Sequence, residues 1–288
     1  MKKSIIGVSA AGTPAASGFW NRIPFFGYQG MGRQANPCIG ASYVAPVTLP
    51  AGSPAASSEV QAQCGFEEVT LLFQGQLQVR DSAGHDSLLE AGDVLWNSAG
   101  RGLLRQDSQG PRLAAEGGTL EMASLWVNLP AAVKLSDPHR QHLAATAIPV
   151  CALPDGAGQL RVIAGEYEGT QGAAETVAPL QLWDIRLQAS DSETRLQLPS
   201  CWYGVLLVLE GTVQVNYWPQ PVTRQQLVFM GAVGQEVSLQ ATQDAHLVLI
   251  SGEPLEEPIA GQGALVMLEP GQVQDCLQQL EAGKFGVL

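Results

Sequence analysis

Side chains able to hold a metal or to transfer protons are few in this sequence of 288 residues. His139 and His142 stand three apart, a spacing that would let two imidazoles chelate a metal from one face of a helix. No third ligand lies nearby, so a polar segment between two domains is the favoured interpretation. His85 is expected at an exposed hairpin tip, and His246 is expected to be packed or solvated within a late strand.

The carboxylates and catalytic motifs give no stronger sign of catalysis. Glu67 and Glu68 are adjacent, so on a strand they point to opposite faces, and the outward one is expected to meet water. The sequence has no nucleophile elbow, no Walker loop and no Gly-x-Gly-x-x-Gly that opens a helix. The motifs of α/β-hydrolases, of nucleoside triphosphatases and of dinucleotide-binding proteins are therefore absent from the sequence.

The cysteines are odd in number and include no Cys-x-x-Cys pair, so neither a disulfide framework nor a zinc site is expected. Buried, reduced thiols of a cytosolic protein are the favoured interpretation for all five, which are Cys38, Cys64, Cys151, Cys201 and Cys276. The alternative for Cys64 is a reactive thiol whose pKa is lowered by Arg105, and a plain small side chain is favoured over it.

Composition and charge narrow the class of protein. The net charge is −12, from 15 basic and 27 acidic residues, and such a surface repels phosphate backbones, so direct nucleic-acid binding is not expected. Met1 and two lysines begin the chain like a signal peptide, but the apolar run at residues 5–8 is too short for one and favours a first strand. No run has the length of a membrane span, and a cytoplasmic monomer is expected.

The elements that would carry any site are strands. Residues 67–79 (EEVTLLFQGQLQV) predict a buried strand, a tight bend at Gly75 and a second strand with one wet face. Residues 202–215 (WYGVLLVLEGTVQV) repeat this pattern around Gly211 at domain length. Chain length and the 45% hydrophobic content suffice for two domains, so the repeat predicts two copies of one antiparallel barrel, face to face.

One helix is predicted, at the end of the chain. Val273, Cys276, Leu277 and Leu280 fall at i, i+3, i+4 and i+7, which is one stripe of a helix. Pro270 and Gly283 suit its ends, and it is expected to pack on the barrels.

Several motifs resemble a cupin, the small jelly-roll barrel, and more closely the pirin family of bicupins. They agree with that family in order and spacing, and they are residues 88–96 (LLEAGDVLW), 125–130 (LWVNLP), 160–169 (LRVIAGEYEG), 252–259 (GEPLEEPI) and 263–267 (GALVM). The resemblance implies an all-β fold of two tandem cupin domains with a short C-terminal α-helix. It divides the chain into an N-terminal cupin (1–135), a linker (136–155), a C-terminal cupin (156–260) and a tail with the helix (261–288).

The resemblance also implies a metal site, from which this sequence departs. Pirins carry a His-x-His pair and a His-x-Glu pair, and these four positions fall here on Gln61, Gln63, Arg105 and Asp107. A glutamine oxygen is a weak neutral ligand, and an arginine is always protonated and repels a cation. Only Asp107 stays a plausible ligand, so no metal and no cofactor are expected, although the family would use Fe(II) or another divalent metal.

The residues at the family's metal-ligand positions are expected to form hydrogen bonds and an ion pair instead of binding a metal. Arg105 and Asp107 are two apart on one strand and so share a face. We expect the guanidinium to take the place of the metal's charge, to pair with Asp107, and to donate its remaining hydrogen bonds to the amide oxygens of Gln61 and Gln63. The alternative is that Arg105 points to solvent and the cavity holds water.

Three roles follow from the family resemblance: iron-dependent dioxygenation of flavonols such as quercetin, redox-sensitive binding of a transcription factor, and modulation of a metabolic enzyme. The departures at Gln61, Gln63 and Arg105 favour a metal-free, non-enzymatic pirin with no catalytic residues, one that binds a small molecule or a regulatory protein partner. The alternative is a metal-dependent quercetin 2,3-dioxygenase. The sequence does not identify the ligand or the partner.

Overall fold

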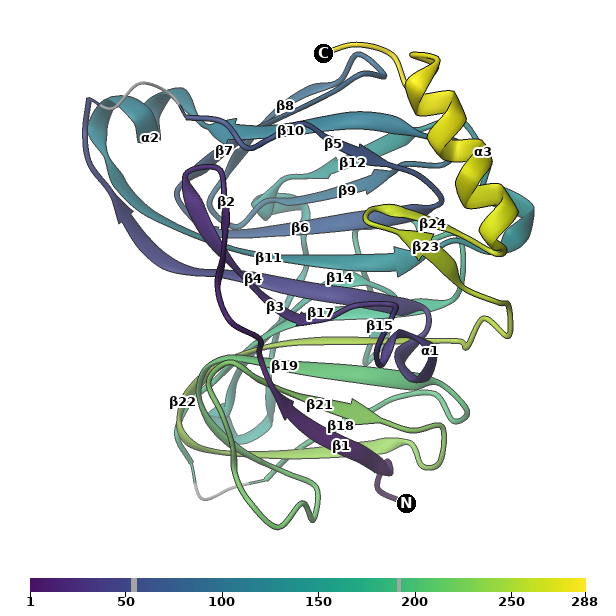
Figure 1. Cartoon of the computed structure of the whole chain (residues 1–288). Helices are drawn as coiled ribbons and strands as arrows, with labels where there is room; N and C mark the ends of the chain where they lie inside the picture. Colours follow the sequence, from purple (N-terminus) through teal and green to yellow (C-terminus); the bar gives the residue numbers. More distant parts are fainter. Residues whose placement is uncertain (53–55, 191–192) are drawn as a thin grey trace. The chain divides into compact units, whose positions relative to one another are not determined.

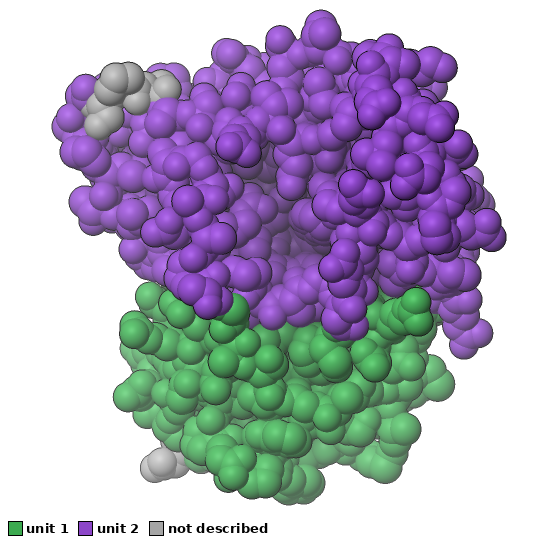
Figure 2. All heavy atoms as spheres, in the orientation of Figure 1, with its two compact units in different colours: residues 1–12, 31–38, 146–254 green, residues 13–30, 39–145, 255–288 purple. Residues whose placement is uncertain are grey.

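A computed structural model describes residues 1–52, 56–190 and 193–288, and these form two compact units. Unit 1 holds residues 1–12, 31–38 and 146–254, and unit 2 holds residues 13–30, 39–145 and 255–288. Figure 2 colours unit 1 green and unit 2 purple. Strands dominate both units, in agreement with the predicted all-β cupin fold and its single longer helix, α3 (Figure 1).

Unit 2 is built from two antiparallel sheets. The first has the order β12-β9-β6-β11-β4-β3-β2 and the second the order β5-β10-β7-β8. Its strands are β2 (Ala15–Ser17), β3 (Trp20–Phe26), β4 (Cys38–Leu49), β5 (Gln61–Gln63), β6 (Phe66–Gln74), β7 (Gln76–Asp81), β8 (Asp86–Glu90), β9 (Val94–Ser98), β10 (Leu103–Gln109), β11 (Gly118–Asn128), β12 (His139–Leu143), β23 (Ala260–Gln262) and β24 (Leu265–Met267). Its helices are α2 (Pro111–Glu116), α3 (Pro270–Glu281) and the single turn η1 (Ala131–Val133).

A dry core fills the space between these two sheets. Leu72, Leu95 and Met122 from the larger sheet meet Leu77 and Leu89 from the smaller one, and all five are buried. The period-two pattern of the sequence produces this arrangement, because alternate residues of each strand face the same side. Burying each of these large apolar side chains contributes about 2 kcal/mol to the free energy of unfolding.

Gly75 makes the bend that the sequence predicts between β6 and β7. Its φ is +93°, a backbone conformation that other residues rarely adopt. A Cβ at this position would lie 2.7 Å from the carbonyl oxygen of Thr119, so both the conformation and the space require glycine.

Unit 1 contains one large sheet of nine strands and a separate sheet of two strands, β15 and β16. The main path of the large sheet is β1-β21-β19-β22-β17-β14-β13, with β18 paired to β22 and β20 paired to β19. The strands are β1 (Ile5–Ala10), β13 (Val150–Ala152), β14 (Gly158–Ala164), β15 (Glu166–Tyr167), β16 (Thr170–Gln171), β17 (Leu180–Leu187), β18 (Thr194–Gln197), β19 (Tyr203–Val215), β20 (Val222–Thr223), β21 (Gln226–Met230) and β22 (Glu236–Gly252). Its short helices are α1 (Gly32–Ala35), η2 (Ala145–Ala147), whose first residue still belongs to unit 2, and η3 (Pro154–Gly156).

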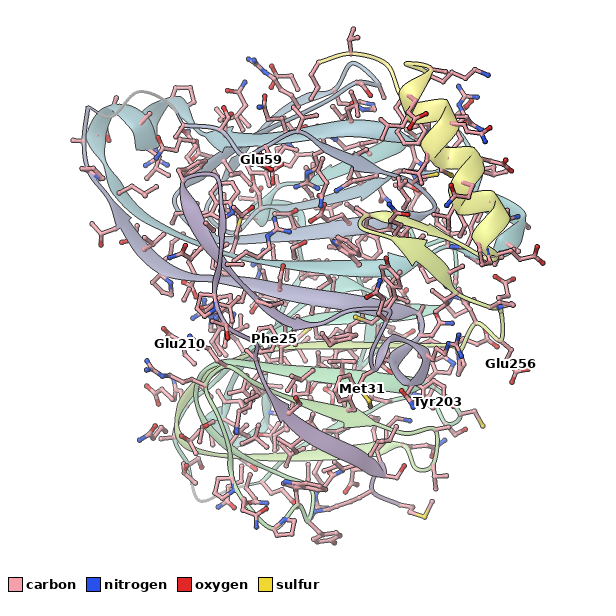
Figure 3. The ribbon with its side chains drawn as sticks, viewed as in Figure 1. Phe25, Met31, Glu59, Tyr203, Glu210 and Glu256 are labelled. Carbon is pink, nitrogen blue, oxygen red and sulfur yellow. The ribbon has the colours of Figure 1, made fainter. Side chains whose placement is uncertain are left out.

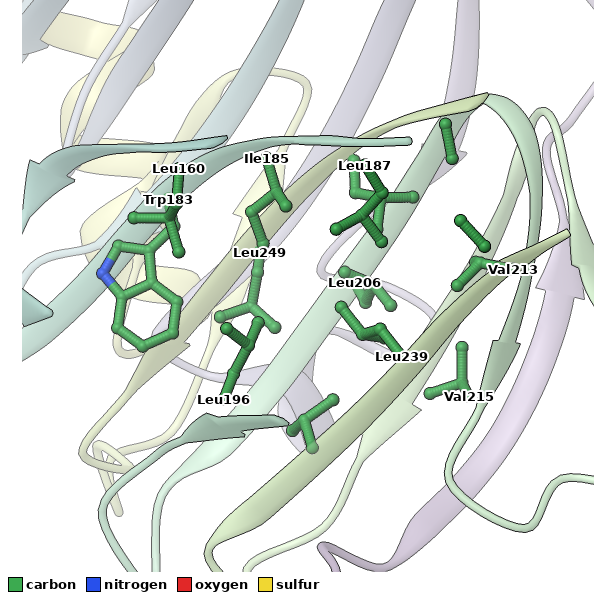
Figure 4. Packing of buried hydrophobic residues seen from close by; sticks show 14 of the residues in the cluster. Leu160, Trp183, Ile185, Leu187, Leu196, Leu206, Val213, Val215, Leu239 and Leu249 are labelled. Atoms are coloured by element: carbon green, nitrogen blue, oxygen red, sulfur yellow. The ribbon is translucent and has the colours of Figure 1, made fainter. Parts of the chain in front are cut away.

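The core of unit 1 is almost purely aliphatic. Figure 4 shows Trp183 packed among leucines and valines that include Leu160, Leu196, Leu206 and Leu249. All five are fully buried. His246 lies in β22, and its Nε2 is 2.7 Å from Asp184 Oδ1, the acceptor; of the two predicted possibilities, packed or solvated, it is packed.

Gly211 does not separate two strands, although the repeated pattern predicts that it does. β19 runs without interruption from Tyr203 to Val215, although Gly211 has a φ of +83°. Its partner β22 follows it through several shifts of register, so the pair bends without a break. The repeated glycine therefore has different structural effects in its two copies.

The boundaries of the units differ from the predicted contiguous domains of residues 1–135, 156–260 and 261–288. β1 pairs with β21, so residues 1–12 belong to unit 1, together with residues 146–254. The predicted linker at 136–155 also contains structure, because β12 pairs with β9 of unit 2 and β13 pairs with β14 of unit 1. The small residues of 49–58 (LPAGSPAASS) predict a loop, and residues 53–55 of it lie outside the described residues.

The tail helix forms as predicted. Pro270 is its first residue, and Glu269 and Gln272 cap its first turn reciprocally, which satisfies backbone N–H groups that have no partner inside the helix. Val273 and Cys276 are buried, and Leu277 and Leu280 pack against the same cluster of unit 2. Figure 1 shows α3 beside the β23–β24 hairpin. No helix in the described part of the chain is long and apolar enough to span a membrane.

Candidate functional site

Strands β5 and β10 bring the four candidate residues of unit 2 together. The strands are antiparallel, and Gln61 lies opposite Arg105 while Gln63 lies opposite Leu103. Gln63, Arg105 and Asp107 are buried, and Gln61 is half-buried. The alternation of strand side chains thus places polar groups at one end of the interior of unit 2, beyond the leucine core.

Arg105 and Asp107 form a buried, two-point ion pair. Arg105 Nε donates to Asp107 Oδ1 at 2.8 Å, and Nη2 approaches Oδ2 at 3.3 Å. The exposed fractions of the two side chains are 3% and 8%, so little water screens the pair. The pairing expected from their shared strand face is confirmed, and Arg105 does not point to solvent.

Glu68 completes this network, and the sequence analysis missed it. Its Oε2 lies 3.2 Å from Arg105 Nη1 and accepts a hydrogen bond from Gln63 Nε2 at 2.5 Å. Its Oε1 accepts from the hydroxyl of Ser124. Glu68, Thr70 and Leu72 share the inner face of β6, so strand alternation alone could have suggested that Glu68 faces the site.

The predicted role of the two glutamines is wrong. Gln63 Nε2 donates to Gln61 Oε1 at 3.0 Å as well as to Glu68, and neither amide oxygen accepts from Arg105 among the described contacts. The guanidinium instead donates to Thr70 Oγ1 at 2.9 Å through Nη2. A second carboxylate provides a stronger acceptor for a buried cation than a neutral amide does.

The electrostatics of the network are nearly balanced. Burial raises the pKa of Glu68, but Arg105, then Arg22, and the hydrogen bonds from Ser124 and Gln63 outweigh it and lower that pKa to about 2. Burial lowers the pKa of Arg105, and the charges of Asp107 and Glu68 more than reverse this. Glu68 and the guanidinium of Arg105 therefore stay charged at neutral pH.

Comparison with known proteins places the chain in a family. Residues 26–127 match the model described as "Pirin", and residues 182–286 match the "Pirin C-terminal cupin domain". A Pseudomonas aeruginosa protein named "Putative quercetin 2,3-dioxygenase PA2418" is 36% identical over 260 residues, which is 90% of each chain. The chain belongs to the pirin family. Other pirin relatives include a tomato (Solanum lycopersicum) "Pirin-like protein", 30% identical over 77% of this chain and 74% of its own.

The fold also agrees with solved structures. A crystal structure titled as quercetin 2,3-dioxygenase from Acinetobacter baumannii has a TM-score of 0.95 at 32% identity, and 99% of both chains is covered. The nickel(II) complex of the Escherichia coli pirin YhhW shares the fold, with a TM-score of 0.65 at 16% identity over 86% of this chain and all of that one.

The four positions of this pirin do not fit a transition metal. Arg105 brings a fixed positive charge into the group, and only Asp107 offers a ligand that such metals prefer. Across residues 1–52, 56–190 and 193–288, no group of three or more histidine, cysteine, aspartate or glutamate side chains is placed to hold a metal ion. The donor set suits an ion-paired network better than a coordination sphere.

A cavity of about 730 Å³ opens beside the network in this pirin. Its lining includes the buried Arg105 and Asp107, the half-buried Gln61 and Arg22, and the exposed Ala16 and Glu59. Glu59, labelled in Figure 3, lies close to β10, where Ser58 N donates to the carbonyl oxygen of Asp107 at 2.7 Å. The site therefore has both a polar floor and room for a small molecule.

Glu67 lies on the opposite face of β6 from Glu68, and it is buried too, with 3% exposed. The expectation that one of the pair meets water is wrong, because both faces of β6 are covered along most of its length. Burial raises the pKa of Glu67 to about 7, although Trp96 and Ser98 act in the opposite direction. Its carboxyl group is therefore protonated in about half of the molecules at pH 7.

The histidines of unit 2 take structural roles. His142 lies in β12 rather than on a helix, and its Nε2 is 2.9 Å from Asp93 Oδ2. His85 is not simply exposed, because its Nδ1 lies 3.0 Å from Asp81 Oδ1 at the β7–β8 turn. His139, two residues before Gln141 on β12, pairs in the ladder with Ser98.

Cys64 is a buried free thiol, as the favoured interpretation predicts, and it also contacts a second cysteine. The hydrogen bond with Cys276 and then burial raise its pKa, so Arg105 does not activate it. Its sulfur lies 3.1 Å from the sulfur of Cys276. No local pattern predicts this contact, because 212 positions separate the two cysteines.

Proposed function

We propose that this pirin is metal-free and non-enzymatic, and that the barrel of unit 2 binds a small molecule. The observation that supports this most is the guanidinium of Arg105, held between Asp107 and Glu68 at the positions where pirins carry metal ligands. The charge of the arginine is already compensated by two buried carboxylates. A divalent cation at the same place would meet that charge at close range, with repulsion that burial strengthens.

The cavity supports a binding role because two of the residues that line it carry buried side-chain nitrogens without a hydrogen-bond partner. These atoms are Arg22 Nε and Arg105 Nη1, although Arg105 Nη1 makes an ion pair at 3.2 Å. Both are donors, so a ligand with carbonyl, phenolic or carboxylate oxygens would complement them. Unsatisfied buried donors cost free energy, and a bound ligand would recover it.

The first expected result is the absence of metal and of turnover. Protein purified without chelators should contain far less than one equivalent of iron, nickel or zinc by elemental mass spectrometry. With added Fe(II) it should not oxidise quercetin faster than the free metal does. The variant Gln61→His/Gln63→His/Arg105→His is the positive control, since three imidazoles and Asp107 give a set that binds Fe(II) or Zn(II).

The second expected result is binding without reaction. Quercetin, the flavonol in the names of the relatives, is a suitable probe because its carbonyl and hydroxyl oxygens can accept from arginine. Arg22→Ala should weaken quercetin binding about tenfold, which corresponds to the loss of one hydrogen bond to a charged donor. Arg80→Ala, an exposed arginine on β7, is the matched control and should leave the affinity unchanged. Titration calorimetry measures both.

Two outcomes would overturn the proposal. Turnover of quercetin that disappears in Asp107→Ala would support the metal-dependent dioxygenase, the function in the names of the relatives. Equal quercetin affinity in Arg22→Ala and in the unaltered protein would show that the cavity is not where the flavonol binds.

A further inference from the structure

The tail helix meets the barrel of unit 2 at a group of sulfur atoms, which we call the sulfur cluster: Cys64, Met267 and Cys276. The Sγ atoms of Cys64 and Cys276 are 3.1 Å apart, and Met267 Sδ is 4.0 Å from Cys64 Sγ. Cys64 follows β5 directly, and Cys276 lies in the middle of α3. Both cysteines are buried, with exposed fractions of 0% and 2%.

A buried cation lies close enough to act on both thiols. Lys134 Nζ donates to the carbonyl oxygens of Gly65 and Val266 at 2.7 and 3.2 Å and to Asn128 Oδ1 at 2.7 Å. Gly65 directly follows Cys64 in the chain, and Val266 directly precedes Met267. The hydrogen bond between the thiols and their burial have the larger effects on the two pKa values, and the positive charge of Lys134 opposes the effect of burial at each thiol.

The two thiols are not equivalent. The hydrogen bond from Cys64 lowers the pKa of Cys276, even though burial acts against this. The same contact, followed by burial, raises the pKa of Cys64. The two thiols therefore titrate together. When the first proton leaves, the negative charge lies on Cys276 and the remaining proton lies on Cys64.

We propose that Cys64 and Cys276 are a redox modification site, a dithiol that a peroxide oxidises to a disulfide. The two sulfurs need to approach by about 1 Å to reach the S–S bond length. The proposal does not depend on the proposed small-molecule binding. It concerns a different part of unit 2, where the tail helix and β5 meet.

The reaction balances with hydrogen peroxide as the oxidant. The Cys276 thiolate attacks one peroxide oxygen, so an S–O bond forms and the O–O bond breaks. The leaving hydroxide takes a proton, and Cys276 becomes a sulfenic acid. Cys64 sulfur then attacks the Cys276 sulfur, the S–O bond breaks, and hydroxide leaves with the Cys64 proton as water. Two thiols lose two electrons, and one peroxide becomes two waters; a small dithiol reverses the change.

The position of the disulfide gives it a structural effect. Cys64 follows Gln63, which donates to Glu68 in the ion-paired network. Cys276 packs with Val273 and Phe285 in the cluster that attaches the tail. The bond would hold α3 to the strand that carries Gln61 and Gln63, and it would limit local opening of the tail.

The experiment uses the whole purified protein. After treatment with hydrogen peroxide, the protein is denatured, its free thiols are alkylated, and its peptides are mapped by mass spectrometry. A cross-linked peptide that joins Cys64 to Cys276 is expected, with two fewer alkylated thiols than in the reduced sample. Dithiothreitol should restore both thiols. The oxidised protein should also unfold at a higher urea concentration than the reduced protein.

Variants separate this site from the other cysteines. Cys64→Ser and Cys276→Ser should each abolish the cross-link and the rise in the urea midpoint. Cys38→Ser, which removes another buried cysteine, should change neither. The proposal fails if peroxide leaves Cys64 and Cys276 free, oxidises either one to a sulfinic acid without a cross-link, or joins either one to another cysteine. Peptide mapping of the unaltered protein decides this even if a variant does not fold.

Discussion

Replacement of Arg105 by alanine should lower the free energy of unfolding by about 3 to 5 kcal/mol, the cost of breaking a buried ion pair from one side. The guanidinium contacts Asp107 at 2.8 Å and Glu68 at 3.2 Å, and the side chains of all three are at most 8% exposed. Without it, two carboxylates lie buried with no cation between them. Urea denaturation at pH 7 measures the loss.

A matched control comes from the surface of the same unit. Arg101 Nη1 lies 2.6 Å from Asp137 Oδ1, but the two side chains are 65% and 78% exposed. Water screens that pair, so Arg101→Ala should cost less than about 1 kcal/mol. A similarly small loss in Arg105→Ala would contradict the view that the guanidinium holds the network together.

The pH dependence of Arg105→Ala provides a second test. The pKa of Glu68 in the folded protein is about 2, below its ordinary value of 4.5, so its contribution to stability is present above about pH 4.5 and is lost as the pH falls toward 2. In Arg105→Ala the main cation that lowers this pKa is gone, and burial raises it. The difference in free energy of unfolding between Arg105→Ala and the unaltered protein should therefore become smaller as the pH falls from 7 to 4. Arg105→Met/Glu68→Gln/Asp107→Asn, which removes all three charges, should recover part of the loss.

The second large effect is expected from Glu67→Gln, and its sign depends on pH. The pKa of Glu67 in the folded protein is about 7, above its ordinary value of 4.5, because the carboxyl group is buried. Such a group stabilises the fold fully below about pH 4.5, and this contribution is lost as the pH rises through 7. The difference of about 2.5 pH units corresponds to about 3 kcal/mol.

Glutamine at position 67 keeps a neutral side chain at every pH. The variant should therefore gain stability relative to the unaltered protein when the pH is raised from 5 to 8, by up to about 3 kcal/mol. Urea denaturation at the two pH values gives this difference. Glu116→Gln, on an exposed end of α2, is the control and should show no such change. If the stability of Glu67→Gln relative to the unaltered protein is the same at pH 5 and at pH 8, then Glu67 is already ionised at pH 5, which contradicts the prediction.

Local features of the structure were predictable because they depend on short spacings. Period-two alternation places Arg105 and Asp107 on one face, and a single glycine marks the bend at Gly75. The i, i+3, i+4, i+7 stripe at Val273 to Leu280 gives the tail helix. Each of these follows from residues within one element or one turn.

The features that escaped prediction depend on what covers an element. Alternation separates Glu67 from Glu68, but it does not reveal that both faces of β6 are buried. The contact between Cys64 and Cys276 and the pairing of β1 with β21 join residues that are about 200 or more positions apart. A single sequence holds no local signal for such contacts, and the participation of Glu68 in the site depends on the same tertiary packing.

The way the chain alternates between its two units has a consequence for its synthesis on the ribosome. β1 lies in the first ten residues but can complete its ladder only after β21, which ends at Met230, has emerged. Unit 2 in turn lacks its tail helix until residue 281 is made. Neither unit can finish folding as an early, independent domain, so shortened chains that stop near residue 145 leave both units with exposed apolar strands. Such nascent chains need protection from aggregation until the residues of α3 have emerged.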